Sequence, residues 1–298
     1  MVISNNAVKV YFCLVNIFHA MRMAQKLIHI IKSSGNVVPF SVDKLRKSLR
    51  RSGANEDTIN DITNQVTDQL HEGMTTKEIY RLAYRLLKKK HRPVASKYTL
   101  KRAIMDLGPS GFPFEKYIGE VLKNSGYQVK LDQVINGQCI NHEVDIFAED
   151  EKTICIIECK YHNSQALHCD VKIPLYVNSR YLDIKAVNDQ NGKEYKGWIV
   201  TNTRFTTDAI KYGACVGLYL LSWDYPQNGS LKELVDKQKI YPVTCLTTLS
   251  KKEKNSLLER SVILCKDLVA KASVLSEIMV TEARIGNIIN EALILTKI

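Results

Sequence analysis

Two short segments, EVDIF at residues 143–147 and TICIIECKY at residues 153–161, decide the fold of the central part of the chain. Both read as strands, and the acidic residues between them predict a tight turn. Side chains alternate between the faces of a strand, so Glu158 and Lys160 share one face. If the two strands pair as a hairpin, Asp145 lies near Glu158.

Two carboxylates that converge beside an ammonium group form a site for a hard cation such as Mg²⁺ or Mn²⁺. Such an ion lowers the pKa of a bound water and neutralises charge on a phosphodiester, while a lysine orients or helps to deprotonate the nucleophile. The competing interpretation is a surface ion pair worth at most about 1 kcal/mol. A zinc site is a weaker alternative, because its four potential ligands lack paired spacing: Cys159, His162, His168 and Cys169.

The surrounding sequence predicts a mixed α/β domain. A cluster of helix breakers at residues 108–111 indicates a linker. Residues 112–124 then have the apolar spacing of a helix that ends near Gly126, and residues 127–134 read as a further strand. A helix followed by a strand meander is typical of mixed α/β folds.

These features together resemble the PD-(D/E)XK nuclease superfamily, and more closely its Mrr-like restriction endonuclease branch. The resemblance is carried by Asp145, by Glu158-x-Lys160 and by the segment GWIVTNT at residues 197–203. It implies a restriction-endonuclease-like domain with a central mixed sheet. It also implies catalytic roles for Asp145, Glu158, Lys160 and Glu115, with the three carboxylates holding Mg²⁺ or Mn²⁺.

The first third of the chain is strongly basic and predicts a β-hairpin followed by four helices. Residues 27–32 and 37–40 read as its two strands, and Ser41 is a plausible N-cap for a helix that ends at Gly53. Helices are further expected over 56–70, from a cap at Thr75 or Thr76 to the basic run before Pro93, and over 94–105.

This arrangement, with IKSSG at residues 31–35 and GMTT at residues 73–76, resembles the ATP-cone, a nucleotide-binding regulatory module. The resemblance implies that Lys32 and Lys44 approach the phosphates of ATP or dATP. It places Thr76 and Tyr80 beside the same nucleotide. Because the chain has no P-loop motif, we expect the nucleotide to be bound and sensed rather than hydrolysed.

The last region and the composition complete the organisation. Helices are expected over 231–237, 250–268 and 273–296, with an amphipathic stripe that packs against the central domain or a partner chain. With 45% hydrophobic residues and a net charge of +11, the chain reads as globular and not as a membrane protein. The eight cysteines show no C-x-x-C pair, which favours reduced thiols and a cytoplasmic protein.

We therefore expect a dispensable extension at 1–23, an ATP-cone at 24–107, the nuclease domain at 108–226 and a helical region at 227–298. The predicted function is a metal-dependent DNA endonuclease regulated by ATP or dATP, with DNA and nucleotide as partners and a possible homo-oligomer. Two alternatives remain open: a nucleotide-responsive DNA-binding regulator whose nuclease fold is idle, and a structure-selective DNA resolvase.

Overall fold

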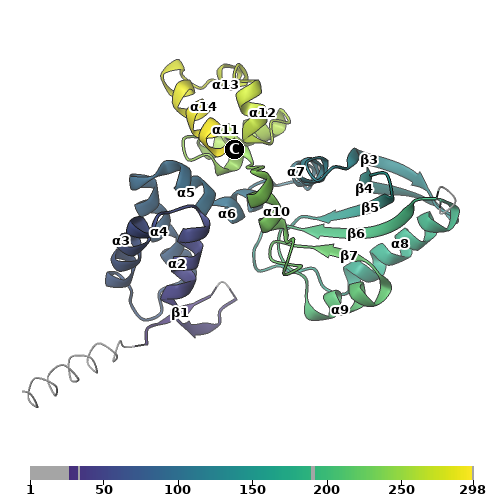
Figure 1. Ribbon diagram of the computed structural model, residues 1–298, viewed down its shortest axis with the longest axis horizontal. Coiled ribbons are helices and arrows are strands. Elements are labelled where there is room, and N and C mark those ends of the chain that lie inside the picture. The colour runs from purple at the N-terminus through teal and green to yellow at the C-terminus, as the bar shows by residue number, and fades with distance from the viewer. Residues whose placement is uncertain (1–26, 33, 189–191, 297–298) are drawn as a thin grey trace, which may run out of the picture.

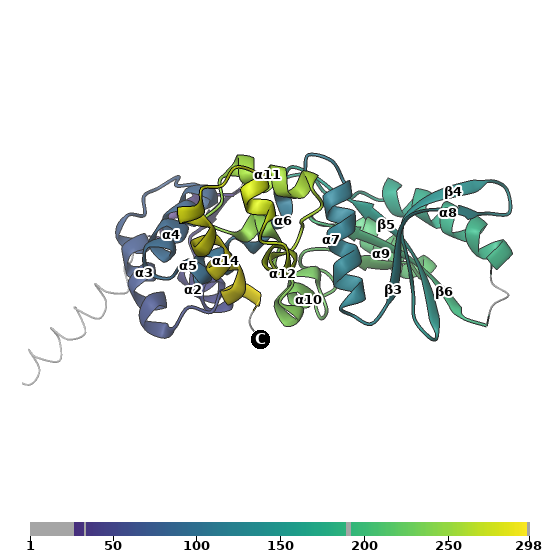
Figure 2. The same ribbon diagram turned by 90° about the horizontal axis from the view of Figure 1, so that it is seen from above.

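The computed structural model describes residues 27–32, 34–188 and 192–296. The predicted extension at 1–23 lies outside them. The chain folds into an N-terminal helical part, a central α/β domain and a C-terminal helical region, which lies against both of the others (Figures 1 and 2). Within the described residues, no helix combines the length and the apolar character needed to cross a membrane.

The N-terminal part confirms the predicted hairpin and helices, with one exception. Ser41, Asn55 and Thr75 each cap a helix by accepting a hydrogen bond from a backbone N–H three residues later. The predicted fourth helix is wrong in its continuity, because it divides at Thr99 into two short helices. The elements are β1 (His29–Ile31), β2 (Val37–Pro39), α2 (Val42–Arg51), α3 (Glu56–Asp68), α4 (Thr76–Lys90), α5 (Arg92–Tyr98) and α6 (Leu100–Met105).

The central domain has a five-stranded mixed sheet in the order β3-β4-β5-β6-β7, as the predicted fold class requires. The first three strands are antiparallel, and β5, β6 and β7 are parallel. Helix α7 packs on one face of the sheet, and α8 and α9 cover the other. The elements are α7 (Phe112–Lys123), β3 (Gln128–Asn136), β4 (Asn141–Glu149), β5 (Thr153–Lys160), α8 (Lys172–Asn188), β6 (Glu194–Thr201), α9 (Thr207–Val216) and β7 (Tyr219–Leu221).

The C-terminal region is more broken than its periodicity predicts. The expected helices over 250–268 and 273–296 are each interrupted, and Ser261 and Met279 there adopt left-handed φ angles of 61° and 64°. A residue in that conformation cannot continue a right-handed helix. The elements are α10 (Leu231–Gln238), the 3₁₀ turn η1 (Val243–Cys245), α11 (Lys251–Glu259), α12 (Cys265–Ala270), α13 (Val274–Glu277) and α14 (Glu282–Thr296).

One hydrophobic core joins the C-terminal region to both neighbours. Leu257, Leu264 and Leu268 of the predicted amphipathic stripe share this core with Phe114 of α7, which confirms that the stripe packs against the central domain. Helix α6 contributes Ile104 to the same core, whereas α2, α3 and α4 enclose a separate one. Helix α6 therefore shares a core with the rest of the protein, and α5 adds a second connection through its contacts with α14.

Candidate active site

Strands β4 and β5 bring the two sequence-predicted carboxylates together. The antiparallel register pairs Ile146 with Ile157, so the next residues along the ladder are Asp145 and Glu158. The Asp145 carboxylate crosses to the neighbouring strand, where its Oδ2 accepts a hydrogen bond of 2.7 Å from the backbone N–H of Cys159. The juxtaposition expected from strand alternation is therefore present.

Glu158 is held by two cations. Its side chain is only 11% exposed, and its Oε1 lies 2.5 Å from the Nζ of Lys160 on the same strand face. Its Oε2 accepts a hydrogen bond of 2.7 Å from the guanidinium of Arg180 on α8. A carboxylate buried to this degree is stable in its charged form only when it is paired, and both oxygens of Glu158 are paired.

Glu115 completes the carboxylate cluster from α7. Burial, followed by the charge of Asp145, raises its pKa to about 7. Burial and the charge of Glu158 also raise the pKa of Asp145. Burial is the larger cause of both pKa shifts and repulsion between the carboxylates adds to it, so an additional positive charge in this space would be stabilised.

Lys160 remains protonated at neutral pH. Burial alone would lower its pKa, but the hydrogen bond to Glu158 and the charges of Glu158 and Asp145 raise it above the ordinary value. A lysine in this state donates hydrogen bonds and stabilises negative charge, and it cannot accept a proton. A protonated lysine at this place suits the first of the two roles expected for Lys160, orientation of the nucleophile.

Sequence reasoning missed two residues of this site. It gave no indication that Arg180 of α8 would contact Glu158. It did not single out Asp132, an exposed residue of β3 whose φ angle is 55° and whose charge also contributes to the raised pKa of Glu115. A non-glycine residue in this backbone conformation is unusual and often marks a functional position. The sequence around Asp132 indicated neither its left-handed backbone conformation nor its proximity to Glu115.

The carboxylates are not arranged as a finished metal site. Among residues 27–32, 34–188 and 192–296, no group of three or more His, Cys, Asp or Glu side chains is placed to hold a metal ion. The three predicted ligands Glu115, Asp145 and Glu158 thus lie near one another without the geometry of a metal site. Both carboxylate oxygens of Glu158 are paired instead, one with Lys160 and the other with Arg180. The donor chemistry nevertheless suits a hard divalent cation, since it consists of repelling carboxylate oxygens.

Only two of the four residues expected at the nucleotide line the same cavity. Thr76 and Tyr80 of α4 line a cavity of about 670 Å³ between the N-terminal part and the central domain. Lys32 and Lys44 are not among the residues that line it. A β-bridge between Ile31 and Thr75 holds the hairpin beside the start of α4. Lys32 is therefore the next residue in the chain after this bridge.

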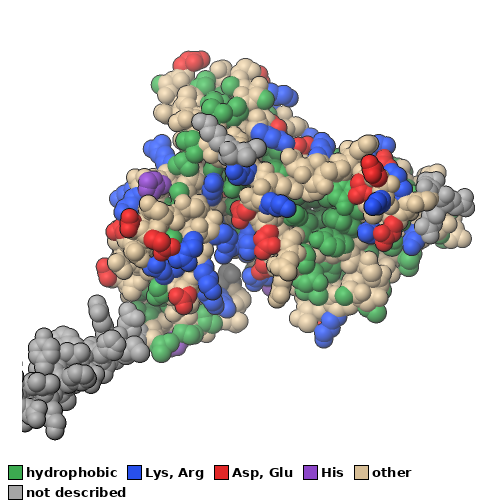
Figure 3. All heavy atoms as spheres, viewed as in Figure 1, with side chains coloured by type: hydrophobic (Ala, Val, Ile, Leu, Met, Phe, Trp, Pro, Cys, Tyr) green, Lys and Arg blue, Asp and Glu red, His purple; other side chains and the backbone are tan. Residues whose placement is uncertain are grey.

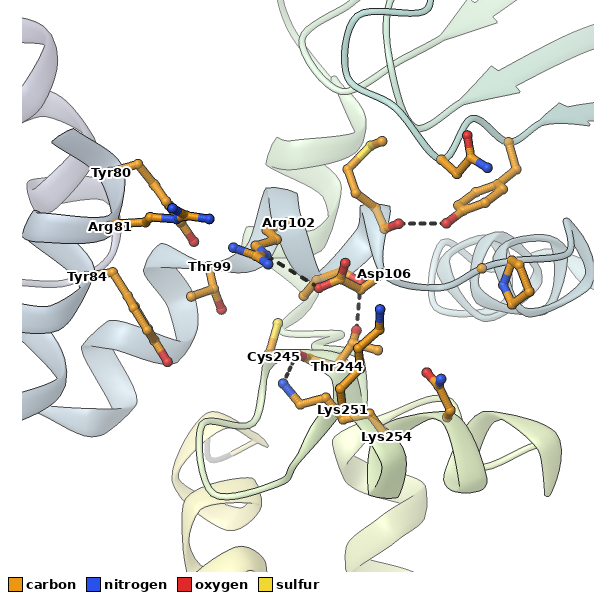
Figure 4. Close-up of a pocket in the computed structure, with 17 residues that line it drawn as sticks. Tyr80, Arg81, Tyr84, Thr99, Arg102, Asp106, Thr244, Cys245, Lys251 and Lys254 are labelled. Atoms are coloured by element: carbon orange, nitrogen blue, oxygen red, sulfur yellow. Dashed lines mark hydrogen bonds and ion pairs between the residues drawn. The ribbon is translucent and has the colours of Figure 1, made fainter. Parts of the chain in front are cut away.

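A second cavity lies on the other side of the same wall. Tyr80, Arg81, Arg102 and Asp106 border both cavities. Figure 4 shows these side chains facing Lys251 and Lys254, which come from α11 of the C-terminal region. Both cavities therefore lie where separate parts of the protein meet.

Comparisons with known proteins identify two segments. The ATP-cone family matches residues 28–107, and the family described as AF1548-like, C-terminal, matches residues 241–295. An uncharacterized protein of Archaeoglobus fulgidus is 31% identical over 176 residues, which are 59% of this chain and 97% of that protein.

Solved structures give a consistent result. The crystal structure of AF1548, a protein of unknown function, superimposes with a TM-score of 0.52 at 28% identity over 62% of this chain and 98% of that one. The MspJI restriction endonuclease in complex with an oligonucleotide aligns at 15% identity over 55% of this chain and 40% of that one, with a TM-score of 0.30. The chain therefore belongs to the AF1548-like family and carries an ATP-cone at residues 28–107.

Proposed function

We propose that this protein is a metal-dependent DNA endonuclease whose activity responds to ATP or dATP bound at the ATP-cone. The observation that carries the proposal is the cluster of Asp145, Glu158 and Lys160 where the pairing of β4 with β5 ends, with Glu115 beside it. Domain boundaries near residues 107 and 226 are part of the proposal.

The cluster supports hydrolysis of a phosphodiester in the following way. Asp145 and Glu158 would hold Mg²⁺ or Mn²⁺, with Glu115 completing the set, and the ion would supply an activated water and neutralise phosphate charge. Lys160, protonated and anchored to Glu158, would orient the nucleophile and stabilise the charge that develops on the phosphate. Arg180 fixes the position of the Glu158 side chain, because its guanidinium donates a hydrogen bond to the carboxylate oxygen that Lys160 does not contact.

Charge on the molecular surface supports a nucleic-acid partner. The chain has a net charge of +11, and Lys and Arg side chains lie on several parts of the face shown in Figure 3. Positive charge of this kind binds the phosphate backbone without reading its sequence. We therefore propose that DNA is held mainly through its backbone.

The pairing of Glu158 with both Lys160 and Arg180 favours one alternative, a nucleotide-responsive DNA-binding regulator. A carboxylate already neutralised by two cations can serve a purely structural purpose. The two functions differ in one measurable property, since only the endonuclease breaks phosphodiester bonds.

The test is cleavage of supercoiled plasmid by purified protein in Mg²⁺ or Mn²⁺, with and without ATP. We expect nicking that disappears without metal and falls by at least about a hundredfold in Glu158→Gln, because the metal-binding carboxylate is lost. Glu151→Gln, at the exposed β4–β5 turn, is the matched control and should cleave normally. DNA binding without nicking in any metal or nucleotide condition would reject the endonuclease and support the regulator.

A further inference from the structure

The cavity that contains Thr76 and Tyr80, here called the junction cavity, has walls from two domains. The ATP-cone supplies one wall from α2, α4, α5 and α6. The opposite wall consists of residues 163–165, which follow β5, together with Trp223 and Lys232. We infer that a nucleoside triphosphate bound here is contacted by the cone and by the central and C-terminal parts at once, so that the nucleotide site is shared between domains.

The size and the aromatic lining of the junction cavity suit a nucleotide. Its volume of about 670 Å³ lies within the range of roughly 300–1,000 Å³ that is usual for small-molecule sites. Tyr80 and Tyr98 line it with their rings stacked, 5.2 Å apart and 10° from parallel. Trp223 also lines the cavity; the residue as a whole is 8% exposed, and the Nζ of Lys101 lies 6.0 Å from the centroid of its ring. Flat apolar rings of this kind form stacking surfaces for a nucleobase.

The charge of the junction cavity suits a polyphosphate. The cone contributes cations from several helices, which are Arg51, Lys77, Arg81, Lys97, Lys101 and Arg102. Lys232 of α10 adds a further cation from the opposite wall, and the acidic side chains in the lining are Asp106 and Asp236.

These cations repel one another in the absence of an anion. Burial, followed by the nearby charge of Arg204, lowers the pKa of Lys101, and Lys232 acts in the same direction. A bound triphosphate would relieve this repulsion, and each phosphate oxygen could accept charge-assisted hydrogen bonds from more than one domain.

The shared site would connect nucleotide binding to β5, the strand that carries Glu158 and Lys160. Residues 163–165 begin three positions after Lys160, and the intervening segment is fastened to the end of α6. Tyr161 donates its hydroxyl to the Met105 carbonyl at 2.6 Å, and His162 is bonded through both backbone groups to the side chain of Asn202. A ligand that presses on residues 163–165 therefore acts on a segment that leads directly back to Lys160.

The inference rests on nucleotide binding by the cone, which is part of the proposed function, and tryptophan fluorescence can test it separately from DNA cleavage. The chain has two tryptophans, so Trp198→Phe leaves Trp223 as the sole reporter. We expect a saturable change of emission when the full-length Trp198→Phe protein is titrated with ATP. Trp223→Phe is the matched control, because the remaining Trp198 packs against Tyr127 and Tyr219 away from the cavity and should stay silent.

A second variant tests the charged wall. Lys232→Ala should weaken ATP binding, measured by calorimetry, about three- to tenfold, since one phosphate contact is removed. Lys237→Ala, on the exposed side of the same helix α10, should bind like the wild type. Tight ATP binding with a silent Trp223 and equal affinities for the two lysine variants would overturn the shared site while leaving the cone intact. Failure of every variant and of the wild type to bind ATP would reject both the shared site and the proposed nucleotide regulation, but not DNA cleavage.

Discussion

Replacement of Glu291 tests how the ATP-cone is attached to the rest of the protein. This α14 residue is 5% exposed, yet its carboxylate accepts five hydrogen bonds. The Ser96 hydroxyl of α5 donates to it at 2.6 Å, and Thr247 and Thr248 each donate a backbone N–H and a hydroxyl at 2.6 to 3.0 Å. Glu291 thus joins the cone to two segments of the C-terminal region.

The expected cost of Glu291→Ala follows from these contacts. The substitution leaves two backbone N–H groups without their acceptor, and each unpaired buried donor costs about 1–3 kcal/mol. The hydroxyls lose less, because they can rotate, and the single proton of the Ser96 hydroxyl has the Arg92 carbonyl oxygen at 3.0 Å as an alternative acceptor. We therefore expect a loss of about 3–5 kcal/mol in the free energy of unfolding, a large share of the roughly 5–15 kcal/mol of a typical domain.

Urea denaturation of the full chain at pH 7 measures this loss. Glu282→Ala, at an exposed position of the same helix, is the control and should change stability by less than about 0.5 kcal/mol. A loss below about 1 kcal/mol for Glu291→Ala would refute the assignment of Glu291 as a structural junction.

The same residue has a predictable pH dependence. Burial alone would raise its pKa, but the hydrogen bonds from Ser96, Thr248 and Thr247 lower it below the ordinary value. A carboxylate with a lowered pKa in the folded state stabilises the protein above its unfolded pKa, and this stabilisation is lost as the pH falls through the folded pKa. The difference between wild type and Glu291→Ala should be greatest near pH 7 and shrink below about pH 4.5. An equal difference at pH 7 and pH 3.5 would contradict this reasoning.

Two further predictions concern the active site and the linker. Glu115→Gln should stabilise the metal-free protein at pH 8 by about 1–2 kcal/mol, after allowance for solvent screening, because it removes a carboxylate that is costly to ionise above its pKa of about 7. Thermal denaturation should show the gain shrink as the pH falls and vanish below about pH 4.5. An equal gain at pH 8 and pH 4 would be inconsistent with the charge cluster. Gly108→Ala should destabilise the protein by about 1–3 kcal/mol, since its Cβ would lie 2.5 Å from the Tyr161 hydroxyl oxygen. Gly286→Ala has open space for its Cβ in α14 and should instead stabilise the protein by about 0.5–1 kcal/mol. Urea denaturation measures both glycine variants, and a Gly108→Ala protein more stable than Gly286→Ala would contradict the packing at the linker.

Local sequence patterns predicted much of the fold. Ser41 and Thr75 carry the side chains that cap helices, and both begin helices in the structure. Strand alternation placed Glu158 and Lys160 on one face, and the hairpin brought Asp145 to them. These features depend on neighbours in the chain, which a single sequence displays directly.

Features that depend on distant contacts were not accessible in this way. Arg180 reaches Glu158 from a helix that follows a further loop, so nothing in the spacing of the two residues indicates their contact. The interruptions at Ser261 and Met279 lie inside apolar periodicity that continues across them. The junction cavity combines α4 with Trp223, which are far apart in the sequence, and only the folded structure brings them together.

Nicking of supercoiled plasmid in Mg²⁺ or Mn²⁺, followed over time for the wild type and Glu158→Gln in parallel, tests directly whether Glu158 serves DNA cleavage. We expect metal-dependent nicking by the wild type, and its loss in a Glu158→Gln protein that retains the wild-type affinity for DNA. An equal rate of nicking in both proteins, or intact DNA in both, would contradict the assignment of the Asp145, Glu158 and Lys160 cluster as the active site.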